Sequence, residues 1–234
     1  MKQPFSHLAS TFVLAQLRQL VEFVTVEKDF FSLSSKERVV KLEASNLLWK
    51  KYLANYLRSI NSDQFMADCK ALVRDCESYE LRERTELTQK VIEHLLQDFV
   101  PILKRFSLVF DTISQHCWAL SNSEKIPFIN DIQGLADYEK EWLLRYSYQE
   151  LCNGMYDIIK LFAPEMPFLI IQSARECTPN LKSIIRKHYK NAFPIFMVSA
   201  NLMGGMRVLV DGQLVDDSWL NKIVFLQEKA TLKM

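Results

Sequence analysis

Few residues in this chain have the types and spacing that chemistry needs. Only one histidine stands next to a cysteine, in the pair His116 and Cys117. Adjacent residues of a helix point about 100° apart, so this pair is poorly arranged as a base and nucleophile. Cys69 and Cys76 are seven residues apart and could share a helix face, but no further zinc ligand lies near them in the sequence. We therefore expect a non-catalytic protein without a metal or another cofactor.

Positive charge gathers near residues 182–190. Arg186, Lys187 and His188 are consecutive, and Lys182 and Lys190 lie four residues to either side of Arg186. In a helix this spacing places several cations on one face. Two interpretations remain open, an ordinary solvated surface and a surface that contacts an acidic partner helix.

Glycine clusters near the end of the chain, where three of the five glycines lie within nine residues. Gly204 and Gly205 lack the GxxxxGK[ST] run of a phosphate-binding loop and precede a β-branched apolar run, Met206–Val210, which predicts a strand. Asp211-Gly212 predicts a two-residue hairpin turn before a partner strand at 213–215. These glycines are therefore interpreted as structural.

A final helix is expected after this hairpin. Asp217 or Ser218 is placed to cap it, and its apolar positions would include Trp219 and Ile223. Upstream, residues 168–174 and 193–198 predict two more strands. Thr178-Pro179 predicts the start of the helix between them, with proline at its first position. The expected order is β-α-β-β-α.

The first 165 residues predict helix almost throughout, from apolar positions with a period close to 3.6. Pro101 should kink or split one of these helices. The expected elements are a helix over 8–26, one from the capping-box pattern at Ser34 to Ile60, one over 63–76, one from Tyr79 to about Trp118, a loop-rich connector over 122–134 and a helix over 137–162.

The predicted fold class is α+β and predominantly α. A helical bundle over 1–120 and a helical connector over 121–164 precede a small C-terminal domain over 165–234, with Pro164 and Pro167 at the boundary. The composition, 49% hydrophobic with a net charge of +1, excludes a disordered chain and gives no indication of nucleic-acid binding. No apolar run of 18 residues is present, so no direct membrane span is expected.

The C-terminal pattern resembles the carboxyl-terminal signature of the δ subunit of F-type ATP synthases, called the oligomycin-sensitivity-conferring protein in mitochondria. Leu202–Met206 supply its apolar and glycine positions, 207–210 the alternating strand, and Val215, Asp216 and Ser218 the segment before the last helix. Asp217 stands where bacterial members often carry glycine. The resemblance covers roughly residues 165–228. Upstream no family motif aligns, and the helical part is about thirty residues longer than the family leads one to expect.

The resemblance implies a non-catalytic subunit of the peripheral stalk, or stator. In that family the amino-terminal bundle holds the amino-terminal segments of the α subunits, and the carboxyl-terminal part holds the b-type stalk helix. Such a subunit resists rotor torque during proton-driven ATP synthesis. It would lie on the cytoplasmic face of a bacterial plasma membrane or the matrix side of the inner mitochondrial membrane.

The candidate residues divide into two sets. The structural set is Gly204, Gly205, Gly212, Asp216 and Ser218. Aromatic and methionine side chains suit a groove that accepts a helix, so the candidate partner-binding set is Phe196, Met206, Trp219 and Ile223. Two alternatives remain open, a free-standing helical adaptor or regulatory protein with a δ-like tail, and an enzyme whose site is assembled from residues distant in sequence.

Overall fold

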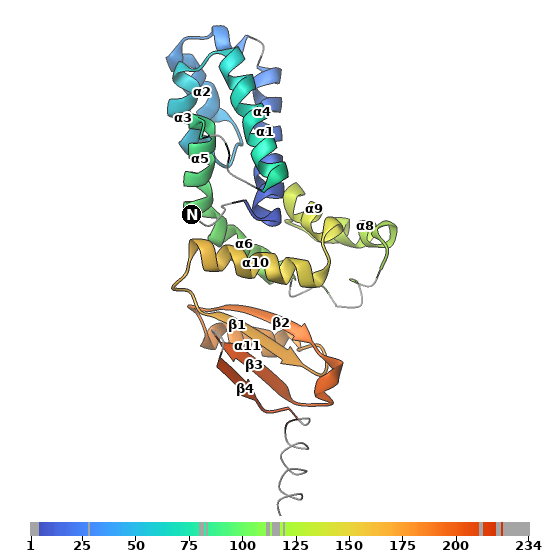
Figure 1. Ribbon diagram of the computed structural model, residues 1–234. Helices are drawn as coiled ribbons and strands as arrows, with labels where there is room; N and C mark the ends of the chain where they lie inside the picture. Colours follow the sequence, from blue (N-terminus) through green and yellow to red (C-terminus); the bar gives the residue numbers. More distant parts are fainter. Residues whose placement is uncertain are drawn as a thin grey trace, which may run out of the picture.

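The computed structural model describes residues 5–27, 29–79, 82, 84–110, 113, 118, 120–210, 213–218 and 221. The chain is mainly helical and contains a small four-stranded mixed sheet (Figure 1). In the view of Figure 1 the helices α1 to α5 lie at one end, the sheet lies at the other, and α6 and α10 run between them. Within the described residues, no helix combines the length and apolarity needed to cross a membrane.

The helices begin where side chains bond the free backbone amides of a first turn. Ser6, Ser34, Asn61, Thr85 and Thr178 each accept a hydrogen bond from the amide three residues later. The helices are α1 (His7–Val26), α2 (Ser35–Ala44), α3 (Lys50–Ser59), α4 (Ser62–Ser78), α5 (Glu86–His94), α6 (Val100–Phe110), α8 (Asn122–Asp131), α9 (Asp137–Arg145), α10 (Tyr148–Phe162) and α11 (Pro179–His188), with short 3-10 turns at Phe30–Ser32 and Ala200–Leu202.

The single helix predicted from Ser34 to Ile60 is wrong, because the chain forms α2 and α3 with a turn between them. Ser45 ends α2 in an extended conformation, and its hydroxyl donates to the Leu42 carbonyl at 2.6 Å. Lys50 Nζ then donates to the carbonyl oxygens of Glu43 and Ser45. The turn was hidden in the sequence because Leu47 is buried there and continues the apolar pattern.

The region 122–162 also differs from the prediction. The expected loop-rich connector is helix α8, which begins with Ser121 donating its amide and hydroxyl to Glu124 Oε2 at 2.9 and 2.6 Å. Pro127 lies inside α8. The helix expected over 137–162 is two helices, α9 and α10, because Ser147 and Glu150 form a capping box that starts a new helix. The capping box at Ser121 therefore starts a helix although Pro127 predicted a loop. The capping box at Ser147 starts a separate helix although the apolar periodicity is continuous from α9 to α10.

The helix expected from Tyr79 to about Trp118 starts later, and Pro101 does not split it. Tyr79 ends α4 with φ of 53°, and α5 begins only at Glu86. A π-helical segment, Leu95–Phe99, joins α5 directly to α6. Pro101 cannot donate a backbone hydrogen bond, and the wider π turn directly before α6 accommodates this missing donor without ending the helix. Figure 1 shows α6 running in a different direction from α5, so the kink is the correct alternative.

The sheet consists of β1 (Phe168–Ser173), β2 (Phe193–Val198), β3 (Met206–Val210) and β4 (Gln213–Asp216) in the order β2-β1-β3-β4. The strand β1 pairs parallel with β2 and antiparallel with β3, and β3 pairs antiparallel with β4. The right-handed βαβ rule places the crossover helix α11 on one face of such a parallel pair. All four predicted strands are confirmed to within a residue of their predicted ends.

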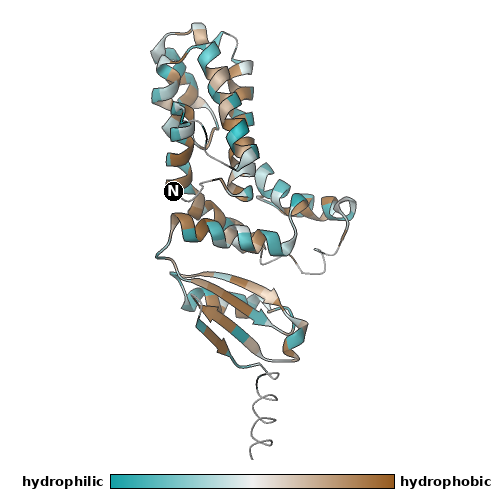
Figure 2. Ribbon diagram, in the orientation of Figure 1, coloured by the Kyte–Doolittle hydropathy of each residue, from teal (hydrophilic) through white to brown (hydrophobic). Residues whose placement is uncertain are grey.

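Both faces of β1 and β2 are covered. Phe168, Phe193 and Ile195 join the large core of the helical part, whereas Leu169 and Ile171 belong to a second cluster packed against α11. Strands buried on both faces are apolar along their length instead of alternating. Figure 2 shows apolar residues over much of the sheet, while the helices mix apolar and polar residues.

Candidate functional site: the C-terminal sheet and its glycine turn

The predicted hairpin of β3 and β4 is present. Val210 pairs with Gln213 and Arg207 with Asp216, so the two strands are in register from end to end. Residues 211–212, which contain Gly212, lie outside the described residues. The strand pairing is therefore confirmed, and the turn type stays a prediction.

The backbone conformation and the close packing at position 205 require a glycine. Its φ is 77°, a conformation that L side chains rarely adopt, and a Cβ there would meet the backbone oxygen of Asp217 and lie 2.9 Å from the Ser218 Cα. The chain after β4 is held against this turn because the Asp217 amide donates to the Met206 carbonyl at 3.0 Å. Gly204 is half-buried beside it. The close approach of two backbone segments explains a glycine at 205.

Asp216 joins the two strands through its side chain. Arg207 on β3 donates to Asp216 Oδ2 from Nη2 at 2.8 Å and from Nε at 3.0 Å. The other carboxylate oxygen accepts the Ser218 amide at 2.9 Å. Hydrogen bonds from Ser218 and then from Arg207 hold the pKa of this carboxyl below its usual value. The carboxylate is therefore a fixed cross-link between β3 and the chain leaving β4.

Ser218 makes the capping contact predicted for this position. It is fully buried, and its hydroxyl accepts the Asn221 amide at 3.2 Å, three residues on. The Asn221 side chain bonds back to the Asp216 carbonyl at 3.0 Å. Residues 219–220 and 222–234 lie outside the described residues, so the final helix and its candidate residues Trp219 and Ile223 stay predictions.

The other two candidate partner-binding residues lie on the α11 side of the sheet. Phe196 is buried, and the cationic groups of Lys182 and Arg186 each lie 5.7 Å from its ring centre. Met206 is half-buried against the same cluster. A partner could reach Phe196 only after α11 moved. Contact of either residue with a partner stays a prediction.

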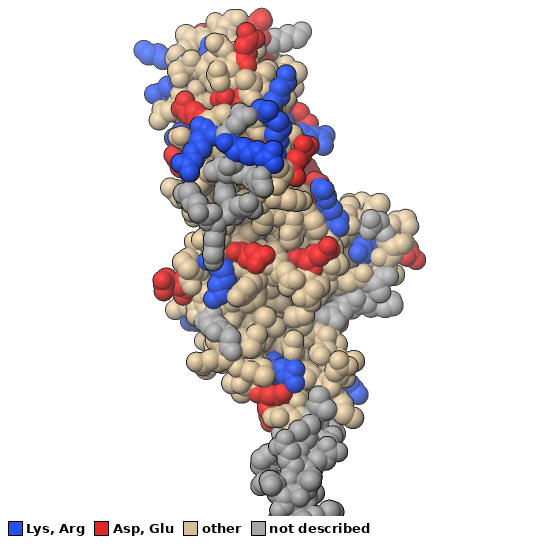
Figure 3. All heavy atoms as spheres, in the orientation of Figure 1, with Lys and Arg blue, Asp and Glu red and all other residues tan. Residues whose placement is uncertain are grey.

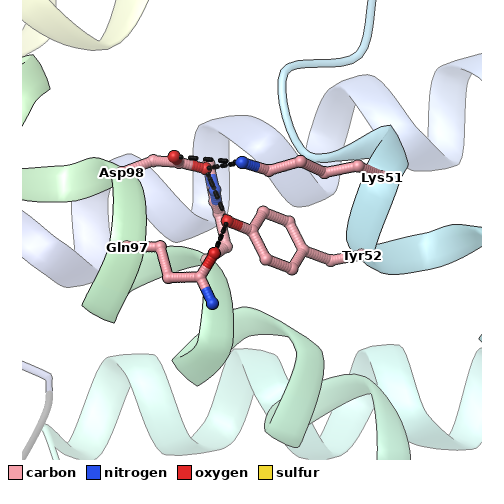
Figure 4. A network of polar contacts seen from close by, with 5 residues as sticks. Lys51, Tyr52, Gln97 and Asp98 are labelled. Carbon is pink, nitrogen blue, oxygen red and sulfur yellow. Dashed lines mark hydrogen bonds and ion pairs between the residues drawn. The ribbon is translucent and has the colours of Figure 1, made fainter.

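A polar cluster in the helical part was not found from the sequence (Figure 4). Asp98 on the π segment is its centre. It lies 2.8 Å from the Tyr52 hydroxyl, 2.9 Å from His94 Nδ1 and 3.1 Å from Lys51 Nζ, while Gln97 Oε1 lies 3.0 Å from the same hydroxyl. The i,i+4 spacing of His94 and Asp98 was the only signal in the sequence. Tyr52 and Lys51 are more than forty residues away along the chain.

The histidine of this cluster is buried among aromatic rings. His94 is 3% exposed, and its Nε2 is buried without a hydrogen-bond partner. Its ring packs against Phe12 at 5.5 Å and Trp49 at 6.2 Å between centroids. Burial lowers the pKa of His94, opposed by its bond to Asp98. The contacts of Asp98 with Lys51 and Tyr52 tie α3 to the π segment.

Cys69 and Cys76 are buried. Burial raises the pKa of Cys69 and of Cys76 to about 12, so both thiols stay protonated near neutral pH. The His116 and Cys117 pair lies outside the described residues. Among the residues that the structure describes, no three His, Cys, Asp or Glu side chains are grouped to hold a metal ion.

Charge is unevenly spread over the molecule. On the face shown in Figure 3, lysine and arginine gather over the helical part, whereas the surface over the sheet carries few charges. A hollow of about 280 Å³ opens between α10 and the sheet, lined by Tyr156, Ile170 and Leu209 among others.

A scan of the sequence against protein-family models and a search of curated proteins both returned no match.

Proposed function

We propose that this protein is a non-catalytic stator subunit of an F-type ATP synthase. In this role it links the α/β catalytic head to the b-type stalk helices and resists rotor torque. Its helical part would contact the amino-terminal segments of the α subunits. Its C-terminal part would contact the stalk, with Met206, Trp219 and Ile223 as the candidate contacts.

One observation carries the proposal. Among the residues that resemble the δ-subunit signature, Arg207, Asp216 and Ser218 are joined by hydrogen bonds, and Gly205 leaves the space that the backbone at 217–218 occupies. A chance sequence match would not require these residues to depend on one another. The order of strands and helix around them also agrees with the resemblance.

Such a subunit has a mechanical function. It must bind at two places and transmit force between them without yielding. The continuous packing of Phe168, Phe193 and Ile195 into the helical core supports this role, because it couples the sheet to the helices through a dense interior.

Purification from detergent-solubilised membranes of the source cells tests the proposal. We expect the tagged protein to bring down α, β and b-type subunits in defined amounts. Recovery with a soluble, unrelated partner in their place would overturn it and favour the adaptor alternative. The length of the helical part, beyond that expected for the family, is the observation that favours this alternative.

A variant sharpens the same test. Gly205→Val should uncouple proton flow from ATP synthesis while ATP hydrolysis by the detached head continues, because the segment 217–218 that follows β4 would be displaced. Gly134→Val is the matched control, since φ is 80° there but a Cβ would meet nothing within 4 Å. Unchanged coupling in a folded Gly205→Val protein would contradict a role for this segment.

A further inference from the structure

A groove runs between α6 and α11, on the face of the sheet opposite α10. We name it the basic groove and define it by Lys104, Leu108, Lys182, Arg186, Lys187 and Lys190. It consists of two adjoining hollows of about 800 and 270 Å³. Because Leu108, Arg186 and Lys190 line both hollows, they form one continuous depression.

Its lining is cationic. Five of its six defining residues carry positive charge, and among the described lining residues Glu176 is the only carboxylate, with Oε1 3.8 Å from Lys182 Nζ. Arg105, at one edge, is already paired with Glu139 at 2.6 Å. Lys104, Lys187 and Lys190 are exposed on the walls of these hollows, so the basic groove attracts negative charge.

Two of these cations are held in place before any partner arrives. Arg186 Nη2 donates to the Ser107 carbonyl at 3.4 Å, and its guanidinium lies over the Phe196 ring. Lys182 is only 8% exposed and lies over the same ring. Side chains already fixed lose less conformational entropy on binding.

The basic groove also has an apolar component. Leu108 is 54% exposed at the centre, where the two hollows meet, and Pro179 lines the larger one. A ligand that only carries negative charge would leave Leu108 in water. The best match is a ligand with an apolar stripe flanked by carboxylates.

We infer that the basic groove binds an acidic amphipathic helix of a partner protein. A helix fits because α11, with ten residues, provides a wall about 15 Å long, and helices present apolar and charged stripes side by side. The chain's own end is a poor occupant, since residues 222–234 carry three lysines and one glutamate. The net charge of +1 does not favour a polynucleotide. The inference does not depend on the stator role.

Binding of a synthetic peptide tests it. The probe is a fluorescein-labelled helix of about 16 residues, with leucine at i, i+3, i+4 and i+7 and glutamate beside that stripe. Its affinity for the full-length protein is measured by fluorescence anisotropy. A shuffled peptide of the same composition, without the stripe, and a single-stranded oligonucleotide are measured alongside.

The protein variants distinguish binding in the basic groove from attraction to the overall charge of the protein. Lys187→Glu with Lys190→Glu should weaken peptide binding by about tenfold or more, and Leu108→Ser by a smaller factor. The matched control, Lys36→Glu with Lys70→Glu, makes the same charge change at exposed sites on α2 and α4 and should change affinity less than about twofold. All four residues with reversed charge are exposed, so circular dichroism should show an unchanged fold.

Three results would overturn the inference. They are equal binding by the wild type and the groove variant, equal binding of the shuffled peptide, and tighter binding of the oligonucleotide than of the peptide. Failure of the stator proposal in the membrane purification would leave this result unaffected, because the peptide assay uses the isolated protein.

Discussion

Trp142 and Phe196 lie in two hydrophobic cores that differ in size and in the elements that enclose them. Trp142 is fully buried in the large core of the helical part, within an aromatic network that includes Phe99, Phe106 and Tyr138. Phe196 lies in the smaller cluster beneath α11. At the outer edge of the sheet, β4 leaves Leu214 and Val215 more than half exposed.

The difference between the large helical core and the small cluster beneath α11 shows that two kinds of interaction stabilise this chain. The helical part depends on buried apolar volume, so many residues share the stabilisation. The C-terminal sheet has less volume to bury and depends more on backbone geometry at Gly205 and on the Asp216 cross-link. Single changes should therefore act through cavities in the first region and through backbone strain in the second.

The largest effect is expected for Trp142→Ala. It would leave a cavity among three aromatic rings and reduce the free energy of unfolding by about 3–5 kcal/mol, measured by urea denaturation with far-ultraviolet circular dichroism. Phe196→Ala should cost no more than about 3 kcal/mol, because a small cluster near the surface can collapse more easily. Trp142→Phe is the conservative control. A larger loss for Phe196→Ala would reverse the ranking of the two cores.

Backbone strain should give the next largest effect. Gly205→Ala forces both an unfavourable φ and a contact with the backbone at 217–218, so we expect a loss of about 2–4 kcal/mol. Gly134→Ala shares the positive φ but has open space, so it should cost about 1–2 kcal/mol. Equal losses in thermal or urea unfolding would show that the close approach at Gly205 adds nothing.

Mild acid should destabilise the helical part through His94. Burial lowers its pKa, so between that value and about 6.5 the unfolded chain binds more protons, and stability falls as pH decreases. Asp98, Lys51 and Tyr52 are the titratable groups facing it. Unfolding free energies at pH 7.5 and 5 should differ less in His94→Phe than in the wild type. Equal differences in both proteins would assign the pH dependence elsewhere.

The smallest effect is expected for Tyr52→Phe. Removing the hydroxyl leaves Asp98 with Lys51 and His94, so the loss should be about 1 kcal/mol. Tyr156→Phe, at a partly exposed ring on α10, is the control and should change stability by less than about 0.5 kcal/mol. If Tyr52→Phe reduced the free energy of unfolding as much as Gly205→Ala does, the polar cluster would contribute as much to stability as the backbone geometry at Gly205.

The strands were predictable because their signals are local. β2 occupies the predicted residues 193–198, and Thr178 caps α11 as its sequence indicates. The helix breaks were not predictable from periodicity, since buried residues such as Leu47 and Trp49 occupy the turn and continue the apolar pattern. The Ser147 and Glu150 capping box was a local signal of the break before α10 that periodicity outweighed.

The sequence by itself determined the mainly helical character, the four strands and the need for glycine before β3. These depend on side-chain periodicity and on the φ angles that each residue allows, which act over a few positions. Only the tertiary structure decided what lies together. It brought Lys51 and Tyr52 to His94 and Asp98, set the order β2-β1-β3-β4, and placed α6 beside α11 to form the basic groove. Such contacts join residues from 25 to 79 positions apart, whose proximity depends on how the whole chain packs.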